Sequence, residues 1–293
     1  MSTRAVLPRL ALLAAAALFS TGGAAIKATA LTSWQVACLR SGVAALVLGV
    51  WLALRRESLP RLSAAVWLVG AVHGATMVLF VAANKLTTAA SAIFLQSTAP
   101  LYLLLLSPWL LGERVRRRDL VYMLVLGVGL ASFFVGLEPP TATSPDPLPG
   151  NLLGAVAGLT WALTVIGLRW LGSRSRGGGE AAAGADVAAV LCGNLLASLA
   201  TLPWALPVAA EPRDWLVVLY LGAFQIALAY VFLTAGTRRV PALEASLLLL
   251  LEPVLSSVWA WWFHGEMPGP WSLAGGALIV VSTAVKTWLD ARR

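Results

Sequence analysis

Hydrophobic residues occur in ten continuous runs of about 20 residues, separated by short polar or glycine-rich connections. A helix needs about 20 apolar residues to cross the hydrocarbon core of a bilayer. The runs do not alternate with polar residues, which argues against the strands of a membrane barrel. The pattern therefore predicts an all-α polytopic membrane protein with ten transmembrane helices, at residues 6–26, 34–54, 64–84, 89–111, 119–137, 149–171, 186–207, 214–235, 242–263 and 270–289.

The second half of the chain repeats the first at an offset of 153 residues. Pro100 recurs as Pro253, and Gly112 recurs as Gly265. Duplicated hydrophobic halves that carry a proline at matching positions point to the binding site of a transporter. The sequence predicts a first five-helix repeat at 1–137, a linker at 138–148 and a second repeat at 149–293.

The composition supports a bilayer as the solvent of this chain. Its 293 residues are 59% hydrophobic and 12% charged, whereas a soluble domain carries about 25% charged residues. A net charge of +8 would favour nucleic acid as a partner if the chain were soluble. Here the basic residues lie in short runs between spans, which is typical of topology signals. We therefore expect the lipid bilayer, and not nucleic acid, as a partner.

The basic residues also orient the predicted bundle. Of the 21 Lys and Arg residues, 17 fall on one face, and Lys27, Lys85 and Arg213 fall on the other. The positive-inside rule places the first face, with both termini, in the cytoplasm and the 138–148 linker outside it. Because five spans are an odd number, the second repeat must be inverted relative to the first. The cytoplasmic stretch 172–185 is glycine-rich, which indicates a flexible linker.

The first predicted span has a competing interpretation. Arg4 and Arg9 precede an apolar core rich in Ala and Leu, which is also typical of a cleaved signal peptide. Residues 18–27 resemble residues 159–169 of the second repeat, and removal would leave nine spans with an unmatched half. We therefore expect this span to be retained.

Short blocks in both halves resemble a known family. Residues 92–101 and 111–113, and their counterparts 245–254 and 265–266, are similar to the paired EamA repeats of the drug/metabolite transporter superfamily. Arg40 also resembles an arginine that is frequent there. The resemblance covers nearly the whole chain and is greatest to exporters of aromatic and other neutral amino acids. It implies an integral protein of a bacterial inner membrane that exports a small metabolite through a cavity between its halves, without ATP hydrolysis or a cofactor.

Pro100 and Pro253 lie near the middle of the fourth and ninth predicted spans. A proline inside a helix removes one backbone hydrogen bond and costs about 3 kcal/mol. The carbonyl that it leaves free is tolerated only against protein or a wet cavity. Kinks tolerated by packing are the alternative, but the match between repeats favours a gating or cavity-lining role.

Two ionisable residues lie inside spans and are candidates for substrate binding and for proton coupling. A carboxylate at Glu252 costs several kcal/mol near the bilayer centre unless it is paired, protonated or wet. His73 shares a helix face with Met77 and Phe80, which could receive an apolar side chain. The alternatives are a neutral acid that fixes one helix to another and a satisfied structural histidine.

Further polar and aromatic residues complete the predicted substrate site. The amides can hydrogen-bond a substrate or join helices, and both interpretations stay open. The candidates are Gln96, Trp161, Thr164, Gln225, Tyr230, Ser256 and Trp259. Arg40 lies about six residues into its span, so we expect its side chain to snorkel outward and pair with helix-end carbonyls rather than anchor a substrate carboxylate.

Several functions compete with amino acid export. A strongly anionic substrate would need several deep Lys or Arg residues, and a cationic drug would need more carboxylates than Glu252. Export of other metabolites or drugs and a non-transporting scaffold remain alternatives. A membrane-embedded enzyme is less favoured, because the sequence has no G-x-S-x-G motif or P-loop. A metal site would need convergent His, Asp or Glu residues, and the spans offer only His73 and Glu252 as clear intramembrane candidates of these types. We expect neither a metal nor catalysis.

Overall fold

A computed structural model describes residues 3–54, 62–110, 117–175, 184–237, 239–240 and 242–291. These residues are nearly all helical, and ten segments are long and apolar enough to cross a membrane. The segments are Val6–Lys27, Ser33–Leu54, Ala64–Leu86, Ala89–Leu106, Arg117–Val135, Pro147–Leu171, Ala185–Ala205, Pro212–Thr237, Glu244–His264 and Pro270–Asp290. The predicted ten-helix architecture is confirmed.

Each half of the chain contributes five of these spans, some of them built from more than one helix. The first half contains α1 (Thr3–Ser20), α2 (Gly22–Lys27), α3 (Ser33–Leu54), α4 (Ala64–Leu86), α5 (Ala89–Gln96), α6 (Ala99–Leu110) and α7 (Arg117–Val135). The second contains α8 (Pro147–Ser175), α9 (Ala185–Ala205), α10 (Pro212–Tyr220), η2 (Leu221–Leu228), α11 (Ala229–Thr237), α12 (Ala242–Leu249), α13 (Leu251–His264) and α14 (Pro270–Ala291).

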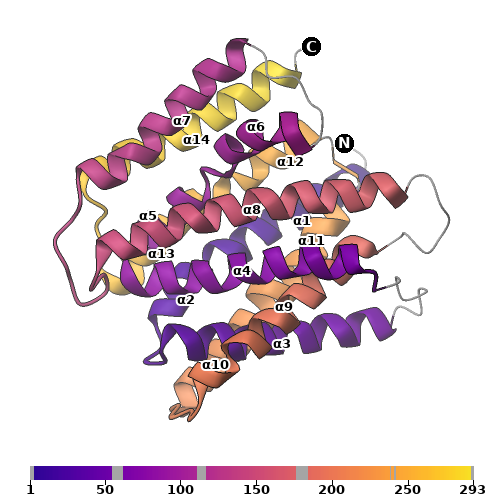
Figure 1. Ribbon diagram of the computed structural model, residues 1–293, viewed down its shortest axis with the longest axis vertical. Helices are drawn as coiled ribbons and strands as arrows, with labels where there is room; N and C mark the ends of the chain where they lie inside the picture. The colour runs from indigo at the N-terminus through magenta and orange to yellow at the C-terminus, as the bar shows by residue number, and fades with distance from the viewer. Residues whose placement is uncertain are drawn as a thin grey trace.

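The halves pack against each other in a reciprocal way. The first span of each half contacts the third and fourth spans of the other: α8 packs on α4 and α5, while α1 packs on α11 and α13. Equivalent spans also pair, because α3 contacts α9 and α7 lies beside α14 (Figure 1). Such reciprocity is expected of two similar units related by an approximate two-fold axis.

Several spans are interrupted where the sequence predicts continuous helices. The fourth span breaks at Ser97 and Thr98, the ninth at Leu250, and the eighth passes through the π-helix η2. Pro100 and Pro253 therefore do not lie within a helix interior, and that prediction was wrong. Each lies in the first turn of the helix after the break, where proline has no intrahelical donor to lose and its fixed φ suits the helix.

The glycine-rich linker predicted at 172–185 starts later than expected. Helix α8 continues to Ser175, so the prediction was wrong for its first four residues. The last residues of this helix are polar in sequence, and polar residues allow a helix to extend past the hydrocarbon layer. The predicted linker residues 176–183 lie outside the described residues.

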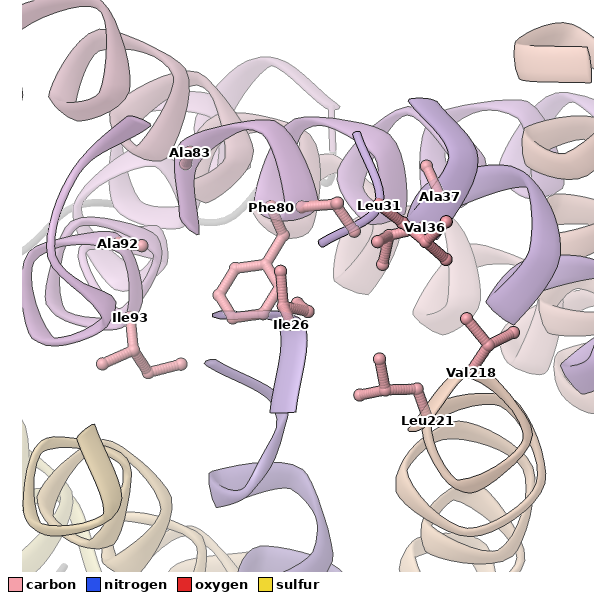
Figure 2. Close-up of a cluster of buried hydrophobic side chains, with 11 residues drawn as sticks. Ile26, Leu31, Val36, Ala37, Phe80, Ala83, Ala92, Ile93, Val218 and Leu221 are labelled. Carbon is pink, nitrogen blue, oxygen red and sulfur yellow. The ribbon is translucent and has the colours of Figure 1, made fainter. Parts of the chain in front are cut away.

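A buried apolar cluster joins the two halves around the short helix α2 (Figure 2). Ile26 of α2 is fully buried among Phe80 of α4, Ile93 of α5 and Leu221 of η2. Inside a bilayer such a cluster stabilises the fold through close packing, because lipid tails are as apolar as the side chains. Phe80 and Ile93 also face the cavity described below, so this cluster forms part of its wall.

Candidate functional site

A cavity of about 320 Å³ lies between the halves, at the level of the breaks in the fourth and ninth spans. Its size is at the low end of the range for small-molecule sites. Its lining consists of Phe19, Arg40, Met77, Phe80, Ile93, Gln96, Ser97, Ala99, Pro100, Trp161, Gln225, Ile226, Tyr230, Leu233, Ser246, Leu249, Leu250, Glu252, Pro253 and Thr283.

The lining follows the internal repeat. Fourteen of these residues form seven pairs at the offset of 153: Met77 with Tyr230, Phe80 with Leu233, Ile93 with Ser246, Gln96 with Leu249, Ser97 with Leu250, Ala99 with Glu252, and Pro100 with Pro253. Paired positions come from equivalent helices, so the repeat duplicates the framework of the wall. Only the prolines are the same residue in both repeats, so the chemistry of the two sides differs.

The helix breaks lie beside this cavity. Helix α5 ends at Gln96 and α12 ends at Leu249, and the proline four residues after each has no N–H to donate to the terminal carbonyl. Both residues line the cavity. Helix α8 approaches the first break at Gly158, where a Cβ atom would lie 2.8 Å from the Leu95 carbonyl oxygen. Non-helical backbone of this kind is tolerated at membrane depth when it faces protein or a wet cavity.

Aromatic rings form one wall of the cavity. The ring of Tyr230 lies edge-on to Phe19, with 5.3 Å between centroids, and edge-on to His73 at 5.5 Å. His73 is fully buried, with its Nε2 atom 3.5 Å from the side-chain nitrogen of Asn194 and its ring 6.5 Å from Trp161. His73 therefore does not line the cavity; it supports the wall from behind.

Three other predicted residues also lie away from the cavity lining. The buried Thr164 hydroxyl donates to the Thr160 carbonyl at 2.9 Å. The Trp259 indole donates to the Ser20 hydroxyl at 3.0 Å and so ties α13 to α1. Ser256 is buried against α2. The predicted residues that do line the cavity are Met77, Phe80, Gln96, Pro100, Trp161, Gln225, Tyr230, Glu252 and Pro253.

Arg40 does not behave as the sequence suggested. It is 1% exposed and lines the cavity, and its Nη2 atom donates to the Met77 carbonyl at 3.0 Å. The predictions of outward snorkelling and of pairing with helix-end carbonyls were therefore wrong, since Met77 lies inside α4. The physical reason is rotational: this face of α3 points into the bundle, a property that depth along the span does not reveal.

Polar groups around the cavity lack protein partners. Arg40 Nε, Gln96 Oε1 and Gln225 Oε1 are buried without a hydrogen-bond partner among the described residues. Glu252 forms no hydrogen bond or ion pair with any of these residues. A buried polar atom left unpaired costs about 1–3 kcal/mol. The cavity is therefore suited to water or to a polar ligand.

A buried ion pair lies at one end of the bundle. The Lys27 ammonium lies 2.8 Å from Glu266 Oε1, and the two side chains are 3% and 2% exposed. Lys27 also donates to the Thr87 carbonyl at 2.8 Å, and Glu266 accepts from the Ala89 amide at 2.9 Å. This Lys27 end joins α2 and the residues after α13 to the loop before α5. Glu113, the repeat partner of Glu266, lies outside the described residues.

The opposite end lies near both ends of the described chain (Figure 1). Arg9 donates to Glu244 at 3.0 Å, and about a third of each side chain is exposed. The cavity lining extends toward this Arg9 end through Leu233, Ser246 and Thr283. The structure thus combines a buried ion pair at the Lys27 end with a cavity that reaches toward the Arg9 end.

A second hollow of about 550 Å³ lies between α1, α3, α9 and α11. Its lining is apolar apart from a few residues such as Thr234 and Arg239, and it includes the strongly exposed Leu7 and Leu10. Exposed leucines on a transmembrane span are typical of a lipid-facing surface. The smaller central cavity, with its charged and amide groups, is therefore the candidate site.

Known proteins share this architecture. The model of the EamA-like transporter family matches residues 7–135 and 148–288. The chain is 28% identical over 271 residues to the pseudopaline exporter CntI of Pseudomonas aeruginosa, with 90% of each chain covered. It is 28% identical over 210 residues to an uncharacterized transporter of Archaeoglobus fulgidus, covering 72% of this chain and 71% of the relative. A crystal structure with 23% identity shares the fold, with a TM-score of 0.66 over 99% of both chains. The chain belongs to the EamA-like transporter family.

Proposed function

We propose that this protein is a secondary transporter that exports aromatic and other neutral amino acids by alternating access between its inverted repeats. The observation that carries the proposal is the central cavity, which lies at the breaks of both proline-containing spans. Broken helices at corresponding positions of two repeats are typical of transporter binding sites. The cavity combines an apolar, aromatic lining with a few unpaired polar groups, which suits a small amphipathic solute.

The lining offers a place for each part of such a solute. Phe80, Trp161 and Tyr230 can pack against an apolar or aromatic side chain. Glu252 can accept a hydrogen bond from a substrate ammonium group, or carry a proton that is exchanged for substrate. His73 lies behind Tyr230, so a coupling role for it would act through the aromatic wall.

The proposed cycle moves the two repeats, residues 1–137 and 149–293, against each other around the linker at 138–148. With both termini in the cytoplasm of a bacterium, the cavity would reach toward the cytoplasm and the Lys27 end would close the outer side. Export then requires the ion pair between Lys27 and Glu266 to separate and the Arg9 end to close. No ATP-binding step is part of this cycle.

A second candidate is export of a different small metabolite. The relative named a pseudopaline exporter favours it, because that name concerns a solute other than a common amino acid. The polar groups of Arg40, Gln96 and Gln225 would also suit a solute with several carboxylate or amine groups.

Counterflow with purified protein in liposomes tests these proposals. The panel comprises tryptophan, phenylalanine, leucine, a nucleoside and a cationic dye, with and without an imposed pH gradient. We expect tryptophan and phenylalanine to exchange fastest, and Trp161→Ala to slow tryptophan more than leucine. Trp170→Ala, on the same helix but outside the cavity lining, is the matched control. Exchange of the nucleoside or dye without any amino acid would contradict the amino acid assignment.

A further inference from the structure

We infer that Arg40 is the carboxylate-binding residue of the cavity and that the transported solute is a zwitterion held between Arg40 and Glu252. The inference rests on the proposed transport function and adds to it a charge pattern and an orientation of the solute. It commits to one ligand class: small molecules with a carboxylate and an ammonium group close together, as on the α-carbon of an amino acid.

The first argument is the missing counter-ion of Arg40. No carboxylate of the described residues pairs with its guanidinium, which makes a hydrogen bond to the Met77 carbonyl and has Nε unpartnered. Arginine has five N–H donors in a planar fork, and the acceptors found among the described residues, the Met77 carbonyl at 3.0 Å and the Met77 sulfur at 3.8 Å, both belong to Nη2. An uncompensated buried charge is strongly unfavourable. Because Arg40 lines the cavity, a solute carboxylate is well placed to complete it, in the two-point geometry that arginine favours.

The second argument is the position of Glu252 relative to Arg40. Arg40 comes from α3 and Glu252 from α13, so the two charges enter the cavity from different repeats. Tyr230 lines the same cavity and interacts electrostatically with both charges. A zwitterion can satisfy both charges at once and place its side chain against the aromatic wall.

The amide groups fit the same orientation. Gln96 and Gln225 each present an unpartnered side-chain oxygen, and these oxygens can accept hydrogen bonds from an ammonium group. Gln225 is fixed from its other side, because its side-chain nitrogen donates to the Phe19 carbonyl at 3.4 Å. One of the two N–H donors of its nitrogen is therefore engaged, and its oxygen remains as an acceptor.

This arrangement predicts discrimination by charge. Tryptamine lacks the carboxylate and would leave Arg40 unpaired, whereas indole-3-propionate lacks the ammonium group and would leave Glu252 unpaired. A site built around buried polar groups rejects analogues that leave those groups without a partner. Both analogues should therefore bind more weakly than tryptophan, although all three share the indole ring.

Binding of radiolabelled tryptophan to the purified full-length protein, with unlabelled analogues as competitors, tests the inference. For the wild type we expect tryptophan to compete at least about tenfold better than tryptamine or indole-3-propionate. Arg40→Gln should weaken tryptophan binding about tenfold or more and tryptamine binding less than about threefold. Arg40→Lys should fall between the two, because lysine keeps the charge without the fork. Arg118→Gln, outside the cavity lining, should bind as the wild type does.

The outcomes separate this inference from the proposed function. Arg40-dependent binding of a different carboxylate-bearing zwitterion, without tryptophan binding, would overturn the aromatic cargo but support Arg40. A folded Arg40→Gln protein with unchanged tryptophan binding would overturn the role of Arg40 alone. If both Arg40 variants fail to fold, the wild-type comparison decides, and tryptamine binding equal to that of tryptophan refutes the inference. If the protein binds neither tryptophan nor any other amino acid of the counterflow panel, the inference is also refuted.

Discussion

The two repeats supply opposite charges along the transport path. The first repeat provides cations at three levels and the second provides carboxylates, as Arg9 with Glu244, Arg40 with Glu252, and Lys27 with Glu266. At the two ends these charges meet in direct ion pairs. At the level of the cavity, Arg40 and Glu252 do not pair. We propose that a solute brings the charges that complete the middle level.

This polarity is not a general property of the repeats. Between α7 and α14 both polarities occur, because Lys286 of the second repeat lies 2.8 Å from Asp119 of the first, and Arg118 of the first lies 2.7 Å from Asp290 of the second. The paired positions of the cavity wall also differ in chemistry although they come from equivalent helices. Pro100 and Pro253 are equal, whereas Ala99 is matched by Glu252. The two repeats thus share a framework, while the residues at paired positions differ in chemistry.

The largest effect is expected from breaking the buried ion pair at the Lys27 end. Lys27→Met leaves Glu266 charged and buried, which should cost about 3–5 kcal/mol of folding free energy. The thermal unfolding midpoint in detergent should fall sharply. The double variant Lys27→Met/Glu266→Leu should regain much of the loss, because it removes both charges. Unchanged unfolding of the single variant would show that the two ends are not held differently.

The next largest effect is expected from removing the charge of Glu252, which has no ion-pair partner among the described residues at the level of the cavity. Glu252→Gln keeps the shape of the side chain but removes the negative charge that faces the solute. We expect the rate of amino acid counterflow to fall about tenfold or more, because a hydrogen bond to a charged group is worth about 1.5–3 kcal/mol. Asp290→Asn, at a half-exposed ion pair outside the cavity, is the control. Equal rates in both variants would remove Glu252 from the site.

A smaller effect is expected from overpacking the contact between α8 and the break in the fourth span. Gly158→Ala places a Cβ atom 2.8 Å from the Leu95 carbonyl oxygen, which forces α8 away from the break in the fourth span. Overpacking of this kind typically costs about 1–3 kcal/mol. We expect a lower unfolding midpoint and slower counterflow. Gly127→Ala is a matched control, because no atom lies within 4 Å of its added Cβ; equal behaviour of the two variants would argue against close packing at the break.

The smallest effect is expected at the Arg9 end. Arg9→Gln breaks an ion pair whose side chains are about one third exposed, and surface ion pairs contribute little to stability. The unfolding midpoint should shift far less than in Lys27→Met, and the shift should vanish in high salt. A loss as large as that of Lys27→Met would show that the Arg9 end also closes the path in this conformation.

Much of this fold could be predicted from the sequence, because the membrane fixes span length and the offset of 153 residues reveals the repeat. The breaks within the spans were harder to predict from the sequence. Hydropathy is the same for a straight and a broken apolar helix, so neither the interruption at Leu250 nor the π-helix η2 leaves a signal in composition. Proline marks these regions but not the residue at which the helix ends.

The site residues were predictable where a polar side chain inside a span or a repeat position marks them. Glu252 and Gln96 stand out as polar residues inside spans, and the repeat offset could also have identified Leu249 and Leu233 as partners of Gln96 and Phe80. Arg40 could not be placed in this way, because its role depends on which face of α3 meets the bundle. His73 likewise has a polar signal, but tertiary packing places it behind Tyr230.

The most direct test of the account is an experimental structure of the protein with tryptophan bound. We predict the solute in the central cavity, with its carboxylate oxygens within about 3 Å of the Arg40 guanidinium and its ammonium group at the same distance from Glu252. Its indole ring should lie against Trp161 or Tyr230. Tryptophan bound in the reverse orientation, or in the hollow between α1, α3, α9 and α11, would contradict the account.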